Sequence, residues 1–109
     1  MILFFKNQTG TIVATESVSK LSDDDVKKLS WLYGEAELLD AESLEGYFVG
    51  PRREMITPWS TNAVEITQNM GLSGILRIEE YFPVKDADAE YDPMLQRLYS
   101  GLDQKIFKV

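Results

Sequence analysis

Residues 50–66 carry the side chains best suited to binding chemistry. Arg52 and Arg53 lie a few positions before Thr57-Pro58, a pair typical of a helix start, with Thr57 as the cap and Pro58 at the first helical position. Backbone N–H groups at a helix N-terminus and guanidinium groups both favour phosphate or carboxylate. The stretch therefore predicts an anion site. The alternative is that the arginines form surface ion pairs with the many acids of the chain.

Trp59 falls in the first turn of this predicted helix, beside the arginines. A tryptophan is more often part of a core, but this position is equally consistent with an interface. Ala63, Ile66 and Met70 recur at the spacing of one buried helical face, and Gly71 is a natural stop. The helix is therefore expected to hold Trp59 and the arginines at its N-terminal end.

The sequence contains no cysteine and no histidine. This excludes a thiolate nucleophile, a disulfide, metal sites made of thiolate or imidazole, and histidine acid–base chemistry. The three acids at residues 23–25 point in different directions around a helix start, so we expect them to cap it. Glu79 and Glu80 alternate across a strand and cannot form a catalytic pair. Any catalytic machinery is expected to lie mostly outside this chain.

The length of the chain favours one domain spanning residues 1–109. Eighteen acids against eleven basic residues give a net charge of −7, which argues against a nucleic-acid partner. No apolar run is long enough to span a membrane, and the first seven residues are too short for a signal peptide. The absence of disulfides fits a reducing compartment, and we expect a cytoplasmic location.

Strands alternate with helices along the predicted fold. We expect a hairpin from strands at 2–5 and 11–15, further strands at 36–39, 47–49 and 74–82, and helices starting at Ser22, Thr57 and Asp92-Pro93. Gly50-Pro51 and Pro83 are expected to end their strands, and the strand at 74–82 to be central. Two strand–helix–strand halves, 11–39 and 47–82, predict an α/β sandwich with a sheet of roughly four to six strands.

Two groups of residues resemble signatures of a known family. They are Pro51-Arg52, Thr57-Pro58-Trp59-Ser60, Ala63 and Ile66, followed by Asp92, Met94 and Leu102-Asp103. In order and approximate separation they resemble phosphoribosylformylglycinamidine (FGAM) synthase, the large single-chain purine enzyme. Glu54, Asn62, Pro93 and Gln96 depart from the residues usual in that family.

The resemblance implies the N-terminal PurS-like domain of a much longer enzyme. Its fold would be α+β, a two-layer sandwich with a mostly antiparallel sheet and two or three helices on one face. The family enzyme converts FGAR, glutamine and ATP to FGAM, so ATP and magnesium would bind the full-length enzyme and no cofactor would bind this fragment. The expected partners are the synthetase and glutaminase domains of the same chain.

No catalytic or metal-binding residue is expected here, and the isolated fragment is predicted to be inactive. The resemblance marks six residues as interface or substrate-proximal: Arg52, Thr57, Pro58, Trp59, Ser60 and Asp92. For Arg52 we favour domain docking over contact with a substrate phosphate, because the chain shows no second phosphate-binding element. Two other functions stay open: a free-standing anion- or small-molecule-binding regulatory module, and an adaptor whose acidic surface binds a basic protein.

Overall fold

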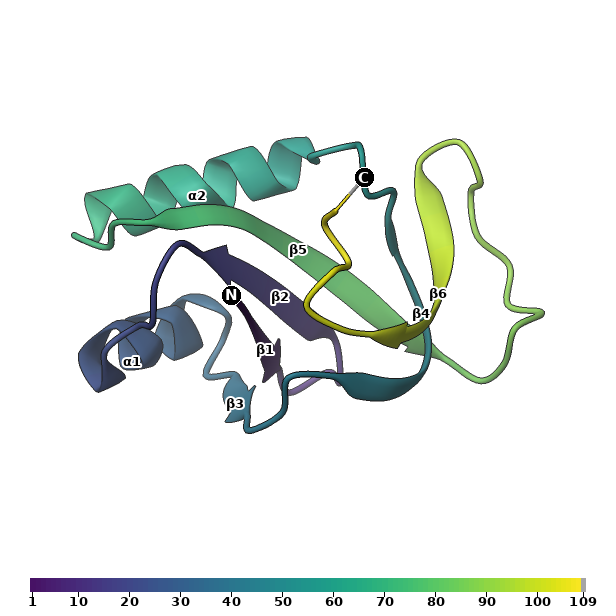
Figure 1. The fold of residues 1–109 in the computed structure, drawn as a ribbon, viewed down its shortest axis with the longest axis horizontal. Helices are drawn as coiled ribbons and strands as arrows, with labels where there is room; N and C mark the ends of the chain where they lie inside the picture. The colour runs from purple at the N-terminus through teal and green to yellow at the C-terminus, as the bar shows by residue number, and fades with distance from the viewer. Residues whose placement is uncertain (109) are drawn as a thin grey trace.

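A computed structural model, which describes residues 1–108, contains one six-stranded sheet and two helices (Figure 1). The elements in chain order are β1 (Ile2–Lys6), β2 (Ile12–Ser17), α1 (Asp23–Leu32), β3 (Glu37–Leu39), β4 (Leu44–Pro51), α2 (Pro58–Asn69), β5 (Ile75–Val84) and β6 (Gln96–Leu102). The sheet order is β3-β1-β2-β5-β4-β6, and all neighbours pair antiparallel. The predicted α+β two-layer sandwich is confirmed, with β5 inside the sheet.

The predicted hairpin and the two strand–helix–strand halves are also confirmed. Asn7 organises the hairpin turn, because its side-chain Oδ1 accepts hydrogen bonds from the backbone N–H groups of Thr9 at 3.1 Å and Thr11 at 3.0 Å. Short polar side chains of this kind stabilise turns by bonding the backbone two to four residues on.

Both helices begin where the sequence predicts. The Ser22 hydroxyl accepts the Asp25 N–H at 3.1 Å, and the Thr57 hydroxyl accepts the Ser60 N–H at 3.0 Å. Each cap satisfies a backbone donor that has no partner inside the helix. The helices then cover the same face of the sheet over a helix-side core made of Phe5, Val13, Leu29, Tyr33, Ala36, Ala63, Leu72, Ile75 and Ile78.

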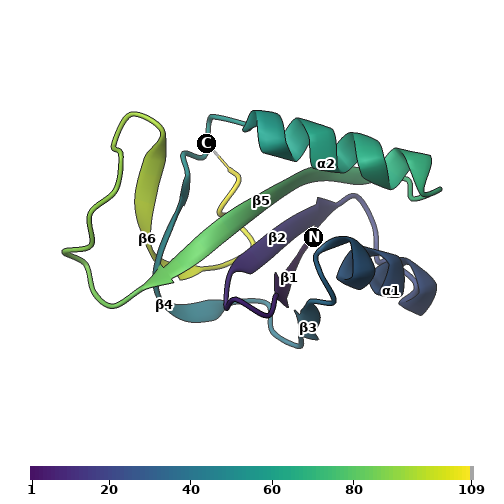
Figure 2. The same ribbon diagram turned by 180° about the vertical axis from the view of Figure 1, so that it is seen from behind.

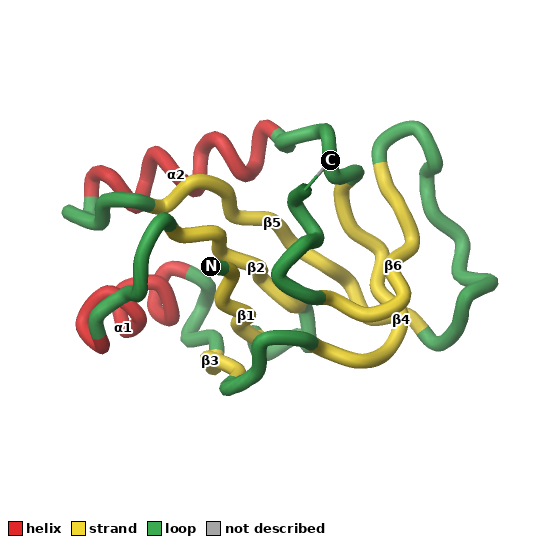
Figure 3. The backbone as a smooth tube through the Cα atoms, viewed as in Figure 1, coloured by secondary structure: helices red, strands yellow, loops and turns green. Residues whose placement is uncertain are grey.

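The opposite face of the sheet is covered by the end of the chain. The segment after β6 crosses this face (Figure 3), and Ile106 is buried there. A tail-side core results, made of Ile2, Phe4, Ile12, Ala14, Phe48, Tyr81, Tyr99, Leu102 and Ile106. Within residues 1–108, α1 and α2 lie beside β1, β2 and β5, and no helix lies over β4 and β6 (Figure 2). The helix-side face of β4 and β6 is therefore not covered by either helix (Figure 2).

The third helix predicted at Asp92-Pro93 is wrong. Residues 93–95 form a turn, with the Asp92 carboxylate accepting the Met94 N–H at 3.0 Å, and β6 follows. β6 pairs with β4 along the edge that β5 leaves free. Long-range pairing satisfies the backbone of both strands, which outweighs the helical spacing of the local apolar residues.

Two predicted strand ends also lie elsewhere. β4 continues through Gly50 and Pro51, and β5 continues through Pro83. Gly50 is needed inside the strand because a Cβ there would lie 2.3 Å from the ring of Tyr81. Pro83 is tolerated because the pairing between β2 and β5 stops at Ile12 and Tyr81. Beyond Tyr81, β5 pairs only with β4, so the missing N–H of Pro83 is not needed by a second neighbour.

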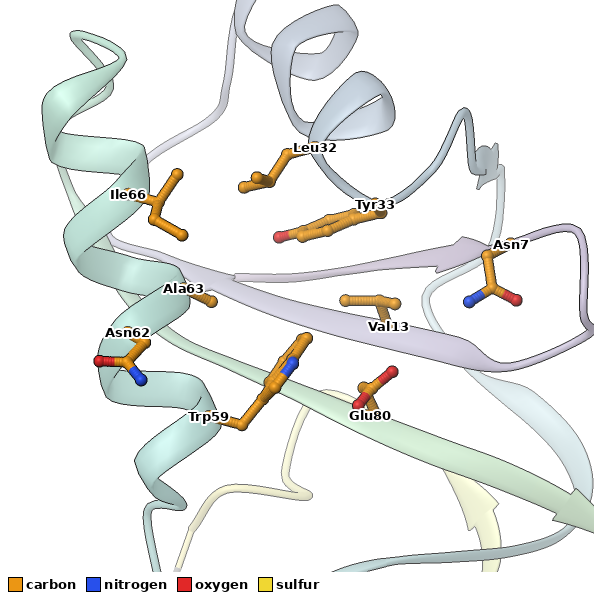
Figure 4. A pocket seen from close by; sticks show the side chains of 9 residues that line it. All are labelled: Asn7, Val13, Leu32, Tyr33, Trp59, Asn62, Ala63, Ile66 and Glu80. Atoms are coloured by element: carbon orange, nitrogen blue, oxygen red, sulfur yellow. The ribbon is translucent and has the colours of Figure 1, made fainter.

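Ile66 is not buried as predicted, since 44% of its surface is exposed. The buried positions of α2 are Ser60, Ala63 and Thr67. Ile66 lies to one side of this line and faces the space between the two helices (Figure 4).

Candidate functional site

The N-terminus of α2 is occupied by an acid of the chain itself. The Glu79 carboxylate accepts the Thr57 N–H at 3.1 Å and the Thr57 hydroxyl at 2.6 Å. Glu79 is 1% exposed. A carboxylate in this position is stabilised by the helix dipole and by the unpaired donors of the first turn. The anion-binding capacity predicted at Thr57 is therefore used internally by Glu79.

Arg77 completes this buried arrangement from two positions away on β5. Its Nε donates to Glu79 at 2.9 Å, and its terminal nitrogens donate to the backbone carbonyls of Arg53 at 2.7 Å, Arg52 at 3.2 Å and Met55 at 2.8 Å. Its guanidinium also lies 4.5 Å from the centre of the Phe107 ring. Arg77 thus fixes the loop that carries Arg52 and Arg53.

Sequence reasoning missed the Arg77–Glu79 pair. Residues two apart on a strand share a face, and Arg and Glu are almost never fully buried unless paired. An Arg and a Glu at this spacing in a central strand were the signal that could have revealed it. Glu80, by contrast, lies on the other face, as predicted, and lines the groove between the helices.

Arg52 forms an ion pair at the surface. Its Nε lies 2.6 Å from Glu54 Oε1, and both side chains are about 40% exposed. Its Nη1 donates to the Pro93 carbonyl at 3.3 Å, so the structure brings the loop after Asp92 next to the loop of Arg52. A backbone hydrogen bond of Glu54 and the neighbouring Arg52 lower the pKa of the Glu54 carboxyl. This geometry matches the alternative reading of Arg52 as a surface ion pair.

The remaining predicted site residues are positioned by α2. Ser60 is fully buried, and its hydroxyl accepts the Ile78 N–H at 3.0 Å, which ties α2 to β5. Pro58 is exposed at the first helical position. Trp59, between Pro58 and Ser60 in the chain, is 42% exposed. The predicted residues therefore divide into Thr57 and Ser60, which hold the helix, and Trp59 and Arg52, which reach the surface.

A groove of about 470 Å³ separates α1 from α2 (Figure 4). Leu32 and Tyr33 form one wall, Trp59, Ala63 and Ile66 form the other, and Val13 and Glu80 form the floor. Tyr33 is fixed by a hydrogen bond of 2.8 Å between its hydroxyl and that of Thr15. Burial, and secondly the neighbouring Glu79, raise the pKa of Glu80. The groove is thus mostly apolar, with one carboxyl at its base.

Trp59 and Glu80 also line a second hollow, which leads from α2 to Phe82 on β5. Phe82 lies opposite Val49, and Val49 opposite Leu98, so these side chains share the helix-side face of β4 and β6, where Val49 is buried and Phe82 exposed. Ile66, Trp59 and Phe82 are each 42–44% exposed. We call these three residues the apolar strip. Exposed apolar surface of this kind usually marks a contact site.

Within residues 1–108, no group of three or more acidic side chains is placed to hold a metal ion. Neither of the two helices combines the length and the apolar character that crossing a membrane requires. The positioned groups are suited to contact with another molecule or domain. Fold and site together define an α+β sandwich module with an exposed apolar strip.

Residues 11–105 match the family model described as formylglycinamide ribonucleotide amidotransferase N-terminal. The chain belongs to this family. It is 37% identical over 68 residues to phosphoribosylformylglycinamidine synthase of Homo sapiens, an alignment that covers 53% of this chain and 5% of the human protein. It is 35% identical over 75 residues to the probable phosphoribosylformylglycinamidine synthase, chloroplastic/mitochondrial, of Arabidopsis thaliana, with 56% of this chain and 5% of that protein covered. The aligned part of this chain thus covers about one twentieth of the length of these relatives.

Proposed function

We propose that this chain is the N-terminal docking domain of an FGAM synthase, the ligase that uses glutamine and ATP to convert FGAR to FGAM. Family membership supports the enzyme class. The proposal includes a cytoplasmic location, and it assigns ATP, magnesium and the glutaminase chemistry to other domains of the same enzyme. The role of this domain is to contact those domains.

The observation that carries the docking role is the exposed apolar strip. Ile66, Trp59 and Phe82 connect the groove between the helices to the helix-side face of β4 and β6. A tryptophan in such a position supplies a large contact area, and buried aromatic residues dominate the binding energy of many interfaces. The synthetase domain is the proposed cover of this strip.

Steady-state kinetics of the full-length synthase test the docking role. Trp59→Ala is expected to uncouple the enzyme, so that glutamine hydrolysis continues while FGAM formation falls by about tenfold, the loss expected for a tryptophan at the centre of an interface. Ammonia supplied directly should restore much of the lost FGAM formation. Trp31→Ala is the matched control, because Trp31 is 69% exposed and does not line the groove. Equal effects of the two substitutions would refute the role of Trp59.

Substitution of Arg52 in the same assay distinguishes a docking role from a role in binding substrate. If Arg52 docks, Arg52→Ala lowers coupling in the manner of Trp59→Ala. If it holds a substrate phosphate, the KM for FGAR rises with either nitrogen source. We favour docking, because the Arg52 side chain is at the surface, holds the loop after Asp92 through the Pro93 carbonyl, and has no second phosphate-binding element beside it in the sequence. Unchanged kinetics would leave Arg52 as the exposed ion pair with Glu54, worth about 1 kcal/mol or less.

A further inference from the structure

All four arginines of the chain gather in one place. Arg52 and Arg53 follow β4, Arg77 lies on β5, and Arg97 lies on β6. Arg77 donates to the Arg53 carbonyl, and Arg97 lies opposite Gly50, directly before this loop. A chain with a net charge of −7 thus concentrates its guanidinium groups around residues 50–53.

Two of the four are engaged internally. Arg77 donates from Nε and both terminal nitrogens to Glu79 and to three loop carbonyls. Arg52 donates to Glu54 and to the Pro93 carbonyl. Their charges still contribute to the local potential, but their donors are largely committed.

Arg53 and Arg97 are different. In the described part of the chain, the buried Arg53 Nε has no hydrogen-bond acceptor, although the side chain as a whole is only half-buried. Arg97 is exposed, and none of residues 1–108 forms an ion pair with it. A buried donor without an acceptor is unfavourable, so a hydrogen bond from Arg53 Nε to an oxygen acceptor would be stabilising.

Tyr99 lies beneath Arg53. The Arg53 guanidinium carbon is 5.7 Å from the centre of the Tyr99 ring. The ring is held by a hydrogen bond of 2.5 Å from its hydroxyl to the Pro51 carbonyl and by an edge contact with Tyr81 at 5.3 Å. Arg97 lies two residues before Tyr99 on β6, so both project from the same face of the strand.

The electrostatics agree with this placement. Burial raises the pKa of the Tyr99 hydroxyl, while Arg53, Arg77 and Arg97 each act to lower it. Three guanidinium groups therefore lie near one tyrosine hydroxyl, and Arg97 also acts to lower the pKa of the Glu54 carboxyl at the edge of this cluster.

We propose that Arg53 and Arg97 form an oxyanion-binding site above Tyr99, which takes a phosphate or carboxylate group. A guanidinium binds such a group with two parallel N–H donors, and rotation of the half-buried Arg53 side chain presents Nε together with a terminal nitrogen. The bound oxygens supply the acceptor that Arg53 Nε lacks. The site is separate from the start of α2, which Glu79 occupies. It does not depend on the docking role proposed above.

Nuclear magnetic resonance of the arginine Nε–H groups tests the site directly in the 109-residue chain. Titration with inorganic phosphate, and separately with acetate, is expected to shift the Arg53 and Arg97 signals in a saturable manner. The Arg77 signal should stay in place, because its donors are committed, and it serves as an internal control. Sodium chloride at matched ionic strength corrects for screening.

Substitutions complete the test. Arg97→Gln and Arg53→Gln are each expected to weaken phosphate affinity by about tenfold or more, the usual contribution of a charge-assisted hydrogen bond. Lys85→Gln is the matched control, since it removes one exposed positive charge just after β5 and should leave affinity unchanged. Stronger binding of phosphate than of acetate assigns the site to a phosphorylated ligand, and stronger binding of acetate assigns it to a carboxylate. Shifts that do not saturate, or an equal loss in Lys85→Gln, would overturn the proposal.

Discussion

At the scale of single residues, the buried pair of Arg77 and Glu79 connects β5 to α2 and to the loop before it. Glu79 caps α2 through Thr57, and Arg77 holds three carbonyls of the preceding loop. Two buried charges are costly unless they are paired and their remaining hydrogen-bond capacity is filled, and here both conditions hold. The pair therefore fixes the loop that carries Arg52 and Arg53 and the start of α2 at Thr57.

Arg77→Met is expected to lower the free energy of unfolding by about 3–5 kcal/mol, because it leaves Glu79 as an uncompensated buried charge. Arg52→Met is the matched control: it breaks the exposed pair with Glu54 and should cost about 1 kcal/mol or less. Urea unfolding followed by circular dichroism measures both. A similar small loss for the two variants would show that the buried pair is not a structural centre.

Glu80 gives a prediction for pH dependence. Its pKa is raised in the folded state, so between the ordinary value of 4.5 and the raised value the folded state binds more protons than the unfolded state. Stability then falls as pH rises through this window. Glu80→Gln removes the effect, and it should stabilise the chain at pH 7 by less than about 1 kcal/mol, given the partial exposure of the side chain.

The difference in unfolding free energy between Glu80→Gln and the wild type should disappear below pH 4.5, where the carboxyl is protonated in both states. Parallel urea titrations at several pH values measure it. A difference that stays constant from pH 4 to pH 7 would assign the effect of the substitution to packing.

At the scale of elements, the two helix caps differ in what they connect. Ser22 accepts only the Asp25 N–H, whereas Thr57 accepts the Ser60 N–H and also donates its hydroxyl hydrogen to Glu79. Ser22→Ala is expected to cost about 1 kcal/mol, and Thr57→Ala about 2 kcal/mol or more, because a hydrogen bond to a buried carboxylate is lost as well. Thr57→Ser should keep most of the stability. Thermal unfolding of the three variants measures these costs, and equal losses for both alanine variants would contradict the connection to Glu79.

Elements defined by local signals could be predicted from the sequence. The caps at Ser22 and Thr57, the turn at Asn7 and the apolar runs of the hairpin depend on residues close together in the chain. The strand at β6 could not be predicted, because its partner β4 lies some fifty residues earlier. The local spacing of Met94, Leu95 and Leu98 favoured a helix instead.

The candidate site shows the same division. Exposure of Trp59 was an open alternative from its place in the first turn of α2, and the structure shows it at the surface. The positions of Arg77, Glu79 and Arg97 around the loop of Arg52 and Arg53 depend on how β5 and β6 align with β4. Strand register between distant segments is set by the whole sheet, so no single segment reveals it.

At the scale of the whole molecule, the two faces of the sheet are covered differently, one by the chain's own tail and the other by the two helices. The tail covers the sheet with Ile106 and Phe107. The helices leave the apolar strip of Ile66, Trp59 and Phe82 exposed. Exposed apolar surface is unfavourable in an isolated domain, and our proposal is that the synthetase domain covers it in the full-length synthase.

Thiol labelling tests this central claim most directly, because the chain contains no cysteine. Ile66→Cys places a thiol on the apolar strip, and Glu65→Cys places one at the exposed neighbouring position, which lines a different surface of α2. Labelling rates are compared between the isolated chain and the full-length synthase by mass spectrometry of the peptide that contains the new cysteine.

The docking account predicts that Ile66→Cys reacts readily in the isolated chain and at least about tenfold more slowly in the synthase, since interface cores exclude solvent. Glu65→Cys should react at similar rates in both. An Ile66→Cys thiol that is equally reactive in the isolated chain and in the synthase would contradict the claim that the apolar strip is covered by another domain.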